Sequence, residues 1–188
     1  MRTPRLFARA ARLAADVRGV AAVEFAIMVP VLLVIYLAGF ELSQGMATYR
    51  KMSDATVELA NVATQYTTMG SLDVASVFNA SSQIMSPYPT QNLGIVLSEV
   101  TTDTNSNAKV TWSCAYNGAT ALTAGQAITL PTGLAQPGIP LSYMLVQTSY
   151  RYVPVAGANF MAAIPMTDQI FMQPRSSPNI PLAGNSCT

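Results

Sequence analysis

The sequence has a long apolar segment near its N-terminus, and this segment constrains the fold more than any other feature. Residues 20–40 contain a single charged side chain, Glu24. As an α-helix the segment would extend about 31 Å, which matches the ~30 Å hydrocarbon core of a bilayer. Pro30 lies inside it, but membrane helices tolerate proline better than soluble helices do. The segment therefore predicts a single transmembrane helix.

Basic residues are concentrated before the apolar segment. Residues 1–18 contain five arginines and one aspartate, a net side-chain charge of +4, whereas the remaining residues carry a net charge of −3. Arginine at one end of a membrane helix favours the cytoplasmic side for that end. We therefore expect a single-pass protein with a cytoplasmic N-terminus and an extracytoplasmic C-terminal part. That part has no basic surface to offer, so we expect no nucleic-acid partner.

Two other targeting segments have a similar composition. A cleaved secretory signal has an apolar region of about 7–15 residues and ends at an Ala-x-Ala site. Here the run from Phe25 to Phe40 is longer, and the following "ELSQGMATYRKM" has no good site of that kind. A mitochondrial presequence is also rich in arginine. Here, however, an apolar spanning segment follows the arginines immediately, which argues against a presequence. A retained anchor is favoured over both.

The helical pattern continues beyond the membrane segment. Apolar residues and threonine recur at steps of three and four, which predicts an amphipathic helix, packed against the chain's own head or against neighbouring subunits. With the span, residues 20–66 would form a rod of about 70 Å. Gly70 ends it, and Ser71 is predicted to cap a second helix over 72–85. The stripe consists of Leu42, Met46, Tyr49, Met52, Thr56, Leu59, Val62 or Ala63, and Tyr66.

The rest of the chain has the pattern of a small antiparallel sheet. Residues 93–100 and 108–116 predict a hairpin, 141–154 a strand with alternating faces, and 166–174 an edge strand. Residues 118–140 predict a long loop with one short strand. The predicted fold is therefore α+β: a long transmembrane and amphipathic helix, a short helix, and a small antiparallel sheet head. In the strand 141–154, one face consists of Met144, Val146, Thr148, Tyr150 and Tyr152.

The residue content limits the chemistry of the head. There is no histidine, and the two cysteines, Cys114 and Cys187, are too few for a Cys-rich zinc site. In an exported domain they fit one disulfide, although spacing alone leaves two free thiols as the alternative. Glu99, Asp103 and Asp168 are isolated, and Lys109 lies in a predicted strand. We therefore expect no catalytic residue, metal, cofactor or small-molecule substrate.

The start of the apolar segment resembles a known processing signal. Gly19, four further residues, Glu24-Phe25 and an apolar helix match the type IV prepilin signature. The run "GVAAVEFAIMVPVLL" is closer still to the TadE-like family of tight-adherence (Flp-type) pilus systems, and "SYRYVP" and "QPR" also resemble that family. The resemblance implies a pseudopilin or minor pilin of the bacterial inner membrane. It implies cleavage after Gly19 by a prepilin peptidase, and other pilins and Tad inner-membrane machinery as partners.

The chemistry of these residues fits that resemblance. Gly19 has no side chain, so its backbone can enter a protease cleft closely. Cleavage would create an ammonium group at Val20, four residues before Glu24, and in related pilins this glutamate is thought to pair with a neighbouring subunit's N-terminus. The alternative is an unpaired Glu24 reaching the interface. Phe25 completes the processing motif.

The predicted organisation has four parts. They are a leader (1–19), a transmembrane helix (20–40), an amphipathic extension (41–69) and an extracytoplasmic head (70–188). A TadG-like adhesion domain would need Asp-x-Ser-x-Ser, but "ATVE" follows Asp54 and "VASV" follows Asp73. A membrane-anchored structural protein, or an enzyme with an uncleaved signal anchor, is the remaining alternative.

Overall fold

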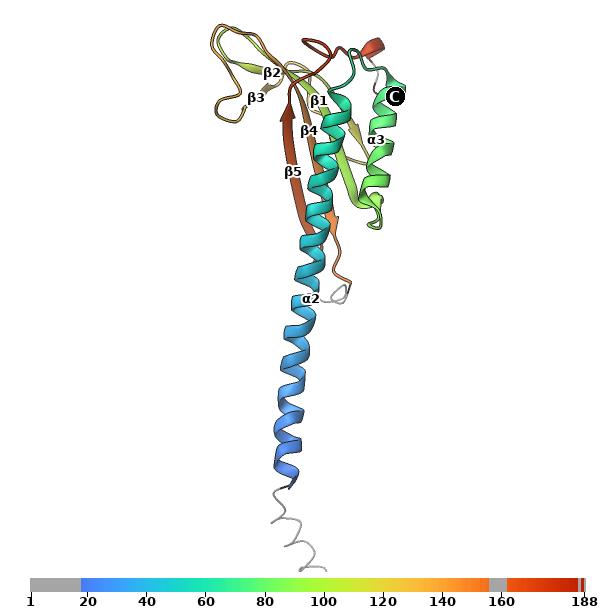
Figure 1. The fold of residues 1–188 in the computed structure, drawn as a ribbon, viewed down its shortest axis with the longest axis vertical. Coiled ribbons are helices and arrows are strands. Elements are labelled where there is room, and N and C mark those ends of the chain that lie inside the picture. The colour runs from blue at the N-terminus through green and yellow to red at the C-terminus, as the bar shows by residue number, and fades with distance from the viewer. Residues whose placement is uncertain (1–17, 156–161, 186, 188) are drawn as a thin grey trace, which may run out of the picture. The chain divides into compact units, whose positions relative to one another are not determined.

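A computed structural model describes residues 18–155, 162–185 and 187. Most of the predicted leader, residues 1–17, lies outside the described residues. Two compact units divide the chain between Ser43 and Gln44, and each is described by itself. Helix α2, Arg18–Ala63, contributes to both units (Figure 1).

The first unit contains the apolar part of α2. Its side chains are exposed on all sides of the helix from Gly19 to Phe40, apart from a half-buried Val29, and Pro30 lies inside the helix. Within the described residues, α2 is the one helix that is long and apolar enough to cross a membrane, judged by length and composition. A helix that is apolar on every side is typical of a membrane span. The predicted membrane-capable helix is therefore confirmed.

The second unit contains a five-stranded antiparallel sheet in the order β3-β2-β1-β4-β5. This sheet and the two helices confirm the predicted α+β class. A β-bulge separates Glu99 from Val100 in the pairing of β1 with β2. The elements are α3 (Ser71–Met85), η1 (Thr90–Asn92), β1 (Leu93–Thr102), β2 (Ala108–Tyr116), β3 (Ala127–Ile128), β4 (Ser142–Tyr152), β5 (Ile164–Met172) and η2 (Ala183–Asn185).

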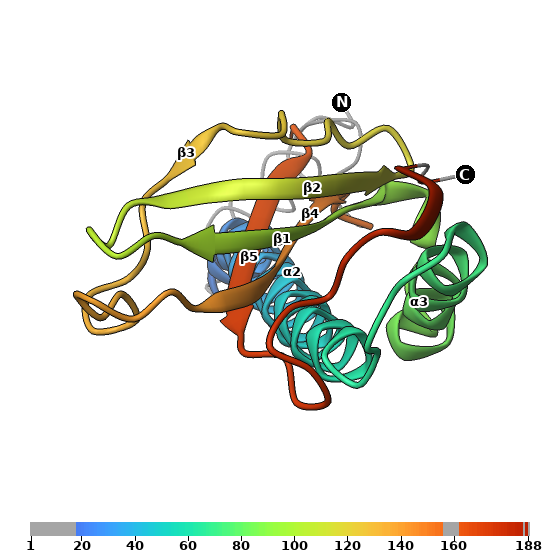
Figure 2. The ribbon, with the colours of Figure 1, turned by 90° about the horizontal axis from the view of Figure 1, so that it is seen from above.

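One face of the sheet packs against the C-terminal part of α2 and against α3 (Figure 2). Met52 and Leu59 of α2 are fully buried in this core. The Oγ1 atoms of Thr56 and Thr148 are 2.6 Å apart in a buried hydrogen bond between α2 and β4. The predicted inward face of β4 is confirmed, since all five of its residues are buried.

The opposite face of the sheet has a smaller apolar cluster. Val100, Ala108 and Leu145 are buried there beneath partly buried side chains, which include Leu122 and Leu130 of the segment between β2 and β4. The alternation of β4 predicted the outward position of Leu145, whereas its burial depends on how this segment folds back. The segment contains the single short strand β3.

The amphipathic stripe of α2 divides into two parts. Met52, Thr56, Leu59 and Ala63 are buried as predicted, whereas Met46 remains exposed. Leu42 and Tyr49 are also exposed, and Val62 and Tyr66 are half-buried. The stripe therefore covers the core only from Met52 onward.

The expected cap of the second helix is wrong. Helix α3 begins at Ser71, and Gly70 is its N-cap residue. The carboxylate of Asp73 accepts a hydrogen bond from the Gly70 N–H at 2.9 Å. A side chain that reaches back from the first turn therefore fixes this terminus, as in one half of a capping box.

Strand β5 is an edge strand, as predicted, and two features limit its pairing with another strand. Pro165 has no N–H group, and the N–H of Gln169 donates to Asp168 Oδ1 at 2.8 Å. Such features are common on edges that avoid uncontrolled association.

Candidate functional site

The residues of the processing motif lie in the first turns of α2. Gly19 and Val20 follow the first helical residue, Arg18, and a Cβ atom added at Gly19 would have no neighbouring atom within 4 Å. Val20, Glu24 and Phe25 are exposed. The structure thus places the four predicted site residues together on an open helical segment.

Glu24 is the one carboxylate in the apolar part of α2 before Glu41. Val20 and Glu24 are one helical turn apart, so their Cβ atoms are neighbours at about 5–6 Å on the helix surface. A carboxylate near the centre of a bilayer costs about 2.5–3.5 kcal/mol on insertion scales, and less toward the interface. An exposed glutamate in this environment would be stabilised by a cationic partner.

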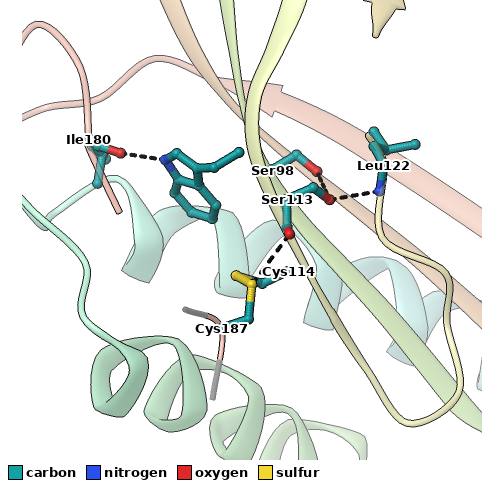
Figure 3. The surroundings of a disulfide bond; sticks show 7 residues. Ser98, Ser113, Cys114, Leu122, Ile180 and Cys187 are labelled. Carbon is teal, nitrogen blue, oxygen red and sulfur yellow. Dashed lines mark hydrogen bonds between the residues drawn. A yellow bond between two sulfur atoms is a disulfide. The ribbon is translucent and has the colours of Figure 1, made fainter. Parts of the chain in front are cut away.

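The C-terminal residues form a second distinctive feature, which we call the C-terminal strap (residues 174–185 and 187). The predicted disulfide is present: Cys114 and Cys187 are joined with a Cα–Cα distance of 5.4 Å (Figure 3). Cys114 lies in the core face of β2, and Cys187 is half-buried. The bond therefore ties the C-terminal strap to the last part of β2.

A pair of side chains holds the backbone of the strap at Ile180. Glu99 and Trp112 are partners across β1 and β2. Glu99 Oε1 accepts a hydrogen bond from the Ile180 N–H at 2.8 Å, and Trp112 Nε1 donates to the Ile180 carbonyl at 2.8 Å. Ser142 Oγ also donates to Glu99 Oε1, at 2.9 Å. We call Glu99 and Trp112 the Ile180 clamp.

The strap also forms hydrogen bonds with the C-terminal end of α2 and with the residues that follow it. The Arg175 N–H donates to the Thr64 carbonyl at 2.9 Å, and the Arg175 guanidinium donates to Asn61 Oδ1 at 2.8 Å. Met69 pairs with the strap through its N–H and its carbonyl. These bonds satisfy backbone groups beyond the helix, which otherwise have no intrahelical partner.

Sequence reasoning missed the Ile180 clamp. The one available signal was an acidic residue in the apolar strand "LGIVLSEV", which usually marks a buried partner. The identity of that partner could not be inferred, because Ile180 is 81 residues further along the chain.

The acidic residues of the head have separate structural roles. Asp168 accepts a hydrogen bond from Ser53 at 2.6 Å and so connects β5 to α2. Asp103 organises the β1–β2 turn, and hydrogen bonds from the Asn107 side chain and backbone hold the pKa of its carboxyl below the ordinary value. Within the part of the chain that the structure describes, no three His, Cys, Asp or Glu side chains form a group that could hold a metal ion.

Comparison with known protein families finds a similarity in the N-terminal part of the chain. The family model described as TadE-like protein matches residues 19–61. No curated protein and no solved structure shows significant similarity to the chain. TadE-like proteins are a structural, pilus-associated family and not a family of enzymes. The match and the membrane-capable helix together fit a membrane protein associated with a Tad pilus. The predicted resemblance to the TadE-like family is therefore confirmed over residues 19–61.

Proposed function

We propose that this protein is a pseudopilin or minor pilin that takes part in the assembly or priming of a Tad/Flp-type pilus. The observation that carries the proposal is the motif Gly19, Glu24, Phe25 at the start of an exposed apolar helix. The match of residues 19–61 to the TadE-like family supports it. The role is structural, and its partners are a prepilin peptidase, other pilins and Tad inner-membrane machinery.

The proposed topology follows from the distribution of charge. The arginine-rich leader, residues 1–19, remains in the cytoplasm, and residues 20–40 span the bacterial inner membrane. The extension 41–69 and the head 70–188 are extracytoplasmic. A disulfide between Cys114 and Cys187 is consistent with an oxidising compartment.

Cleavage after Gly19 is the proposed first step of maturation. The peptide bond between Gly19 and Val20 is hydrolysed, and the amine of Val20 is protonated to an ammonium group. This cation balances a carboxylate in lipid, so we assign Glu24 of one subunit to the Val20 ammonium of its neighbour. Pairing offsets the cost of the charge and fixes the axial position of one helix against the next.

A matched pair of glycine variants tests the cleavage step. The positions of Gly19 and Gly39 both leave open space for a Cβ atom on α2. When the protein is co-expressed with a prepilin peptidase, Gly19→Val should retain the leader, whereas Gly39→Val should be processed like the wild type. Equal processing of both variants would exclude Gly19 as the cleavage position.

A cysteine cross-link tests the assembly step. Ala22 lies between Val20 and Glu24 in the chain, so a cysteine there should cross-link to the major pilin in the assembling fibre. In chains that have been cleaved after Gly19, Glu24→Gln should abolish this cross-link, because it removes the negative charge and keeps the side-chain shape. Glu58→Gln, at an exposed position of α2 in the extension, is the matched control. Cross-links to inner-membrane components alone would exclude a role in the pilus shaft.

A further inference from the structure

The end of the second unit near Gly45 has an unusual surface for a domain proposed to be extracytoplasmic. A Cβ atom added at Gly45 would lie 3.7 Å from the Tyr152 ring and 3.8 Å from the Met166 methyl group, so β4 and β5 pack closely on α2 here. Around this point are exposed apolar and aromatic side chains, together with two exposed arginines. We call it the hairpin-base surface; its members are Met46, Tyr49, Arg50, Arg151, Val153, Val155 and Ile164.

The direction of β4 carries the chain toward the membrane end of α2. Thr148 contacts Thr56, and four residues later Tyr152 packs at Gly45. As β4 advances, its contacts on α2 therefore move back toward the apolar span. Val155 follows three residues after Tyr152 and is 79% exposed. A large apolar side chain thus lies just beyond the strand, at this end of the head.

The covalent chain keeps this surface close to the bilayer. Gly45 is five residues after Phe40, the last residue of the apolar segment. Five residues span at most about 18 Å when fully extended, and as a helix they rise about 7.5 Å. The headgroup layer on each side of the hydrocarbon core is about 5–8 Å thick. Gly45 is therefore within reach of the headgroups.

The composition of the hairpin-base surface matches that of membrane interfaces. Tyrosine is enriched at the headgroup level, where its ring is apolar and its hydroxyl group is hydrated. Arginine side chains place their charge beside lipid phosphates while their stems remain on apolar surface. Isolated exposed apolar residues are ordinary, but a group that combines them with arginine and tyrosine beside a membrane span points to lipid.

We propose that the hairpin-base surface rests on the outer face of the inner membrane, with Val155 at the boundary between headgroups and acyl chains. The arginines Arg50 and Arg151 contact lipid phosphates, and Tyr49 lies at the headgroup level. This lipid contact would fix the orientation of the head before the subunit leaves the membrane. The inference rests on the proposed membrane insertion of residues 20–40, and not on cleavage or entry into a pilus.

Nitroxide quenching of a fluorophore tests this contact in the full-length protein. Single cysteines at Val155, Leu72 and Leu33 are labelled with bimane, and each variant is reconstituted in nanodiscs of phosphatidylcholine and phosphatidylglycerol. Some of the lipids carry a nitroxide near the top of the acyl chain. Leu72, 82% exposed at the start of α3, is the matched control, because α3 begins beyond the C-terminal end of α2. From Gly45 to that end, Ala63, α2 rises about 27 Å.

We expect quenching at Val155 at least threefold stronger than at Leu72. Equal quenching at these two positions, with strong quenching at Leu33, would overturn the lipid contact and leave membrane insertion intact. Absence of quenching at Leu33 would instead refute the proposed insertion. If the label at Val155 were shielded from solvent only at high protein density in the membrane, and were not quenched by the nitroxide lipids, the surface would be assigned to contact with a second copy of the chain. That result would overturn the proposal. Tyr49→Cys provides a second probe, on α2, should the Val155 variant fail to fold.

Discussion

Replacing Cys187 with alanine should destabilise the head strongly without disturbing its core. Cys187 is half-buried, whereas Cys114 is fully buried and keeps its sulfur atom in this variant. The two cysteines are 73 residues apart, so the disulfide closes a long loop in the unfolded chain. The loop-entropy relation gives about 15 cal/mol/K for this length, or about 4 kcal/mol at 25 °C.

The single tryptophan provides the assay. Trp112 is buried and donates a hydrogen bond to Ile180, so its fluorescence reports on both the core and the C-terminal strap. Urea unfolding of the full-length protein in detergent, followed at this tryptophan, should give a free energy of unfolding lower by about 4 kcal/mol. With a slope near 2 kcal/mol/M, the midpoint would fall by about 2 M.

Reduction of the wild-type protein is the matched control. It should reproduce the loss, and adding reductant to Cys187→Ala should change nothing further. A variant whose free energy of unfolding lies within about 1 kcal/mol of the wild type would refute the reasoning. The strap would then be held by its hydrogen bonds and packing alone.

Three further results are expected from the same unfolding assay. Glu99→Ala should lower the free energy of unfolding by about 2–6 kcal/mol, because it leaves two buried donors without their acceptor at about 1–3 kcal/mol each; a loss below 1 kcal/mol would contradict the Ile180 clamp. Leu59→Ala should cost about 2–5 kcal/mol through the cavity it leaves, whereas its exposed neighbour Glu58→Ala should change stability by less than about 0.5 kcal/mol. Burial raises the pKa of the Tyr150 hydroxyl above its ordinary value of 10.0. The stability that the protonated Tyr150 hydroxyl contributes is therefore complete below pH 10 and is lost as the pH rises through the folded-state pKa. Tyr150→Phe should weaken the decline of the urea midpoint at alkaline pH. An unchanged decline would contradict this assignment.

Much of the fold could be predicted from local patterns. The membrane-capable part of α2 follows from an apolar run long enough to cross a bilayer, and the two faces of β4 follow from strict alternation. Both patterns can be read locally because the apolar residues of α2 are consecutive and those of β4 alternate. The prediction that Ser71 caps α3 was wrong because the helix begins one residue earlier. The Gly70 carbonyl accepts the hydrogen bond from the Val74 N–H, and Asp73 accepts one from the Gly70 N–H.

Long-range contacts set the limit of prediction from this sequence. The stripe on α2 was predicted to pack against the head or against neighbouring subunits, and the pattern could not tell that Met52 is buried in the core of this chain whereas Met46 is exposed. The strap has the irregular composition "RSSPNIPLAGNSCT", so neither its course nor its binding by Glu99 and Trp112 could be inferred. Cysteine content did predict the disulfide, because the chain offers a single pairing.

The residues of the processing motif were predicted from the sequence. The structure shows that they lie in the exposed first turns of α2. Gly19 and Glu24 are close in sequence, so their proximity needed no tertiary information. The proposed partner of Glu24 belongs to another subunit, and its charge would arise only after cleavage. Both parts of this proposal concern assembly and not the fold of one chain.

The intact mass of the protein isolated from its native host tests the central claim most directly. The account predicts a mature chain that begins at Val20 and has lost residues 1–19. A mature chain that begins at Met1, or at any residue beyond 40, would contradict the proposed prepilin pathway.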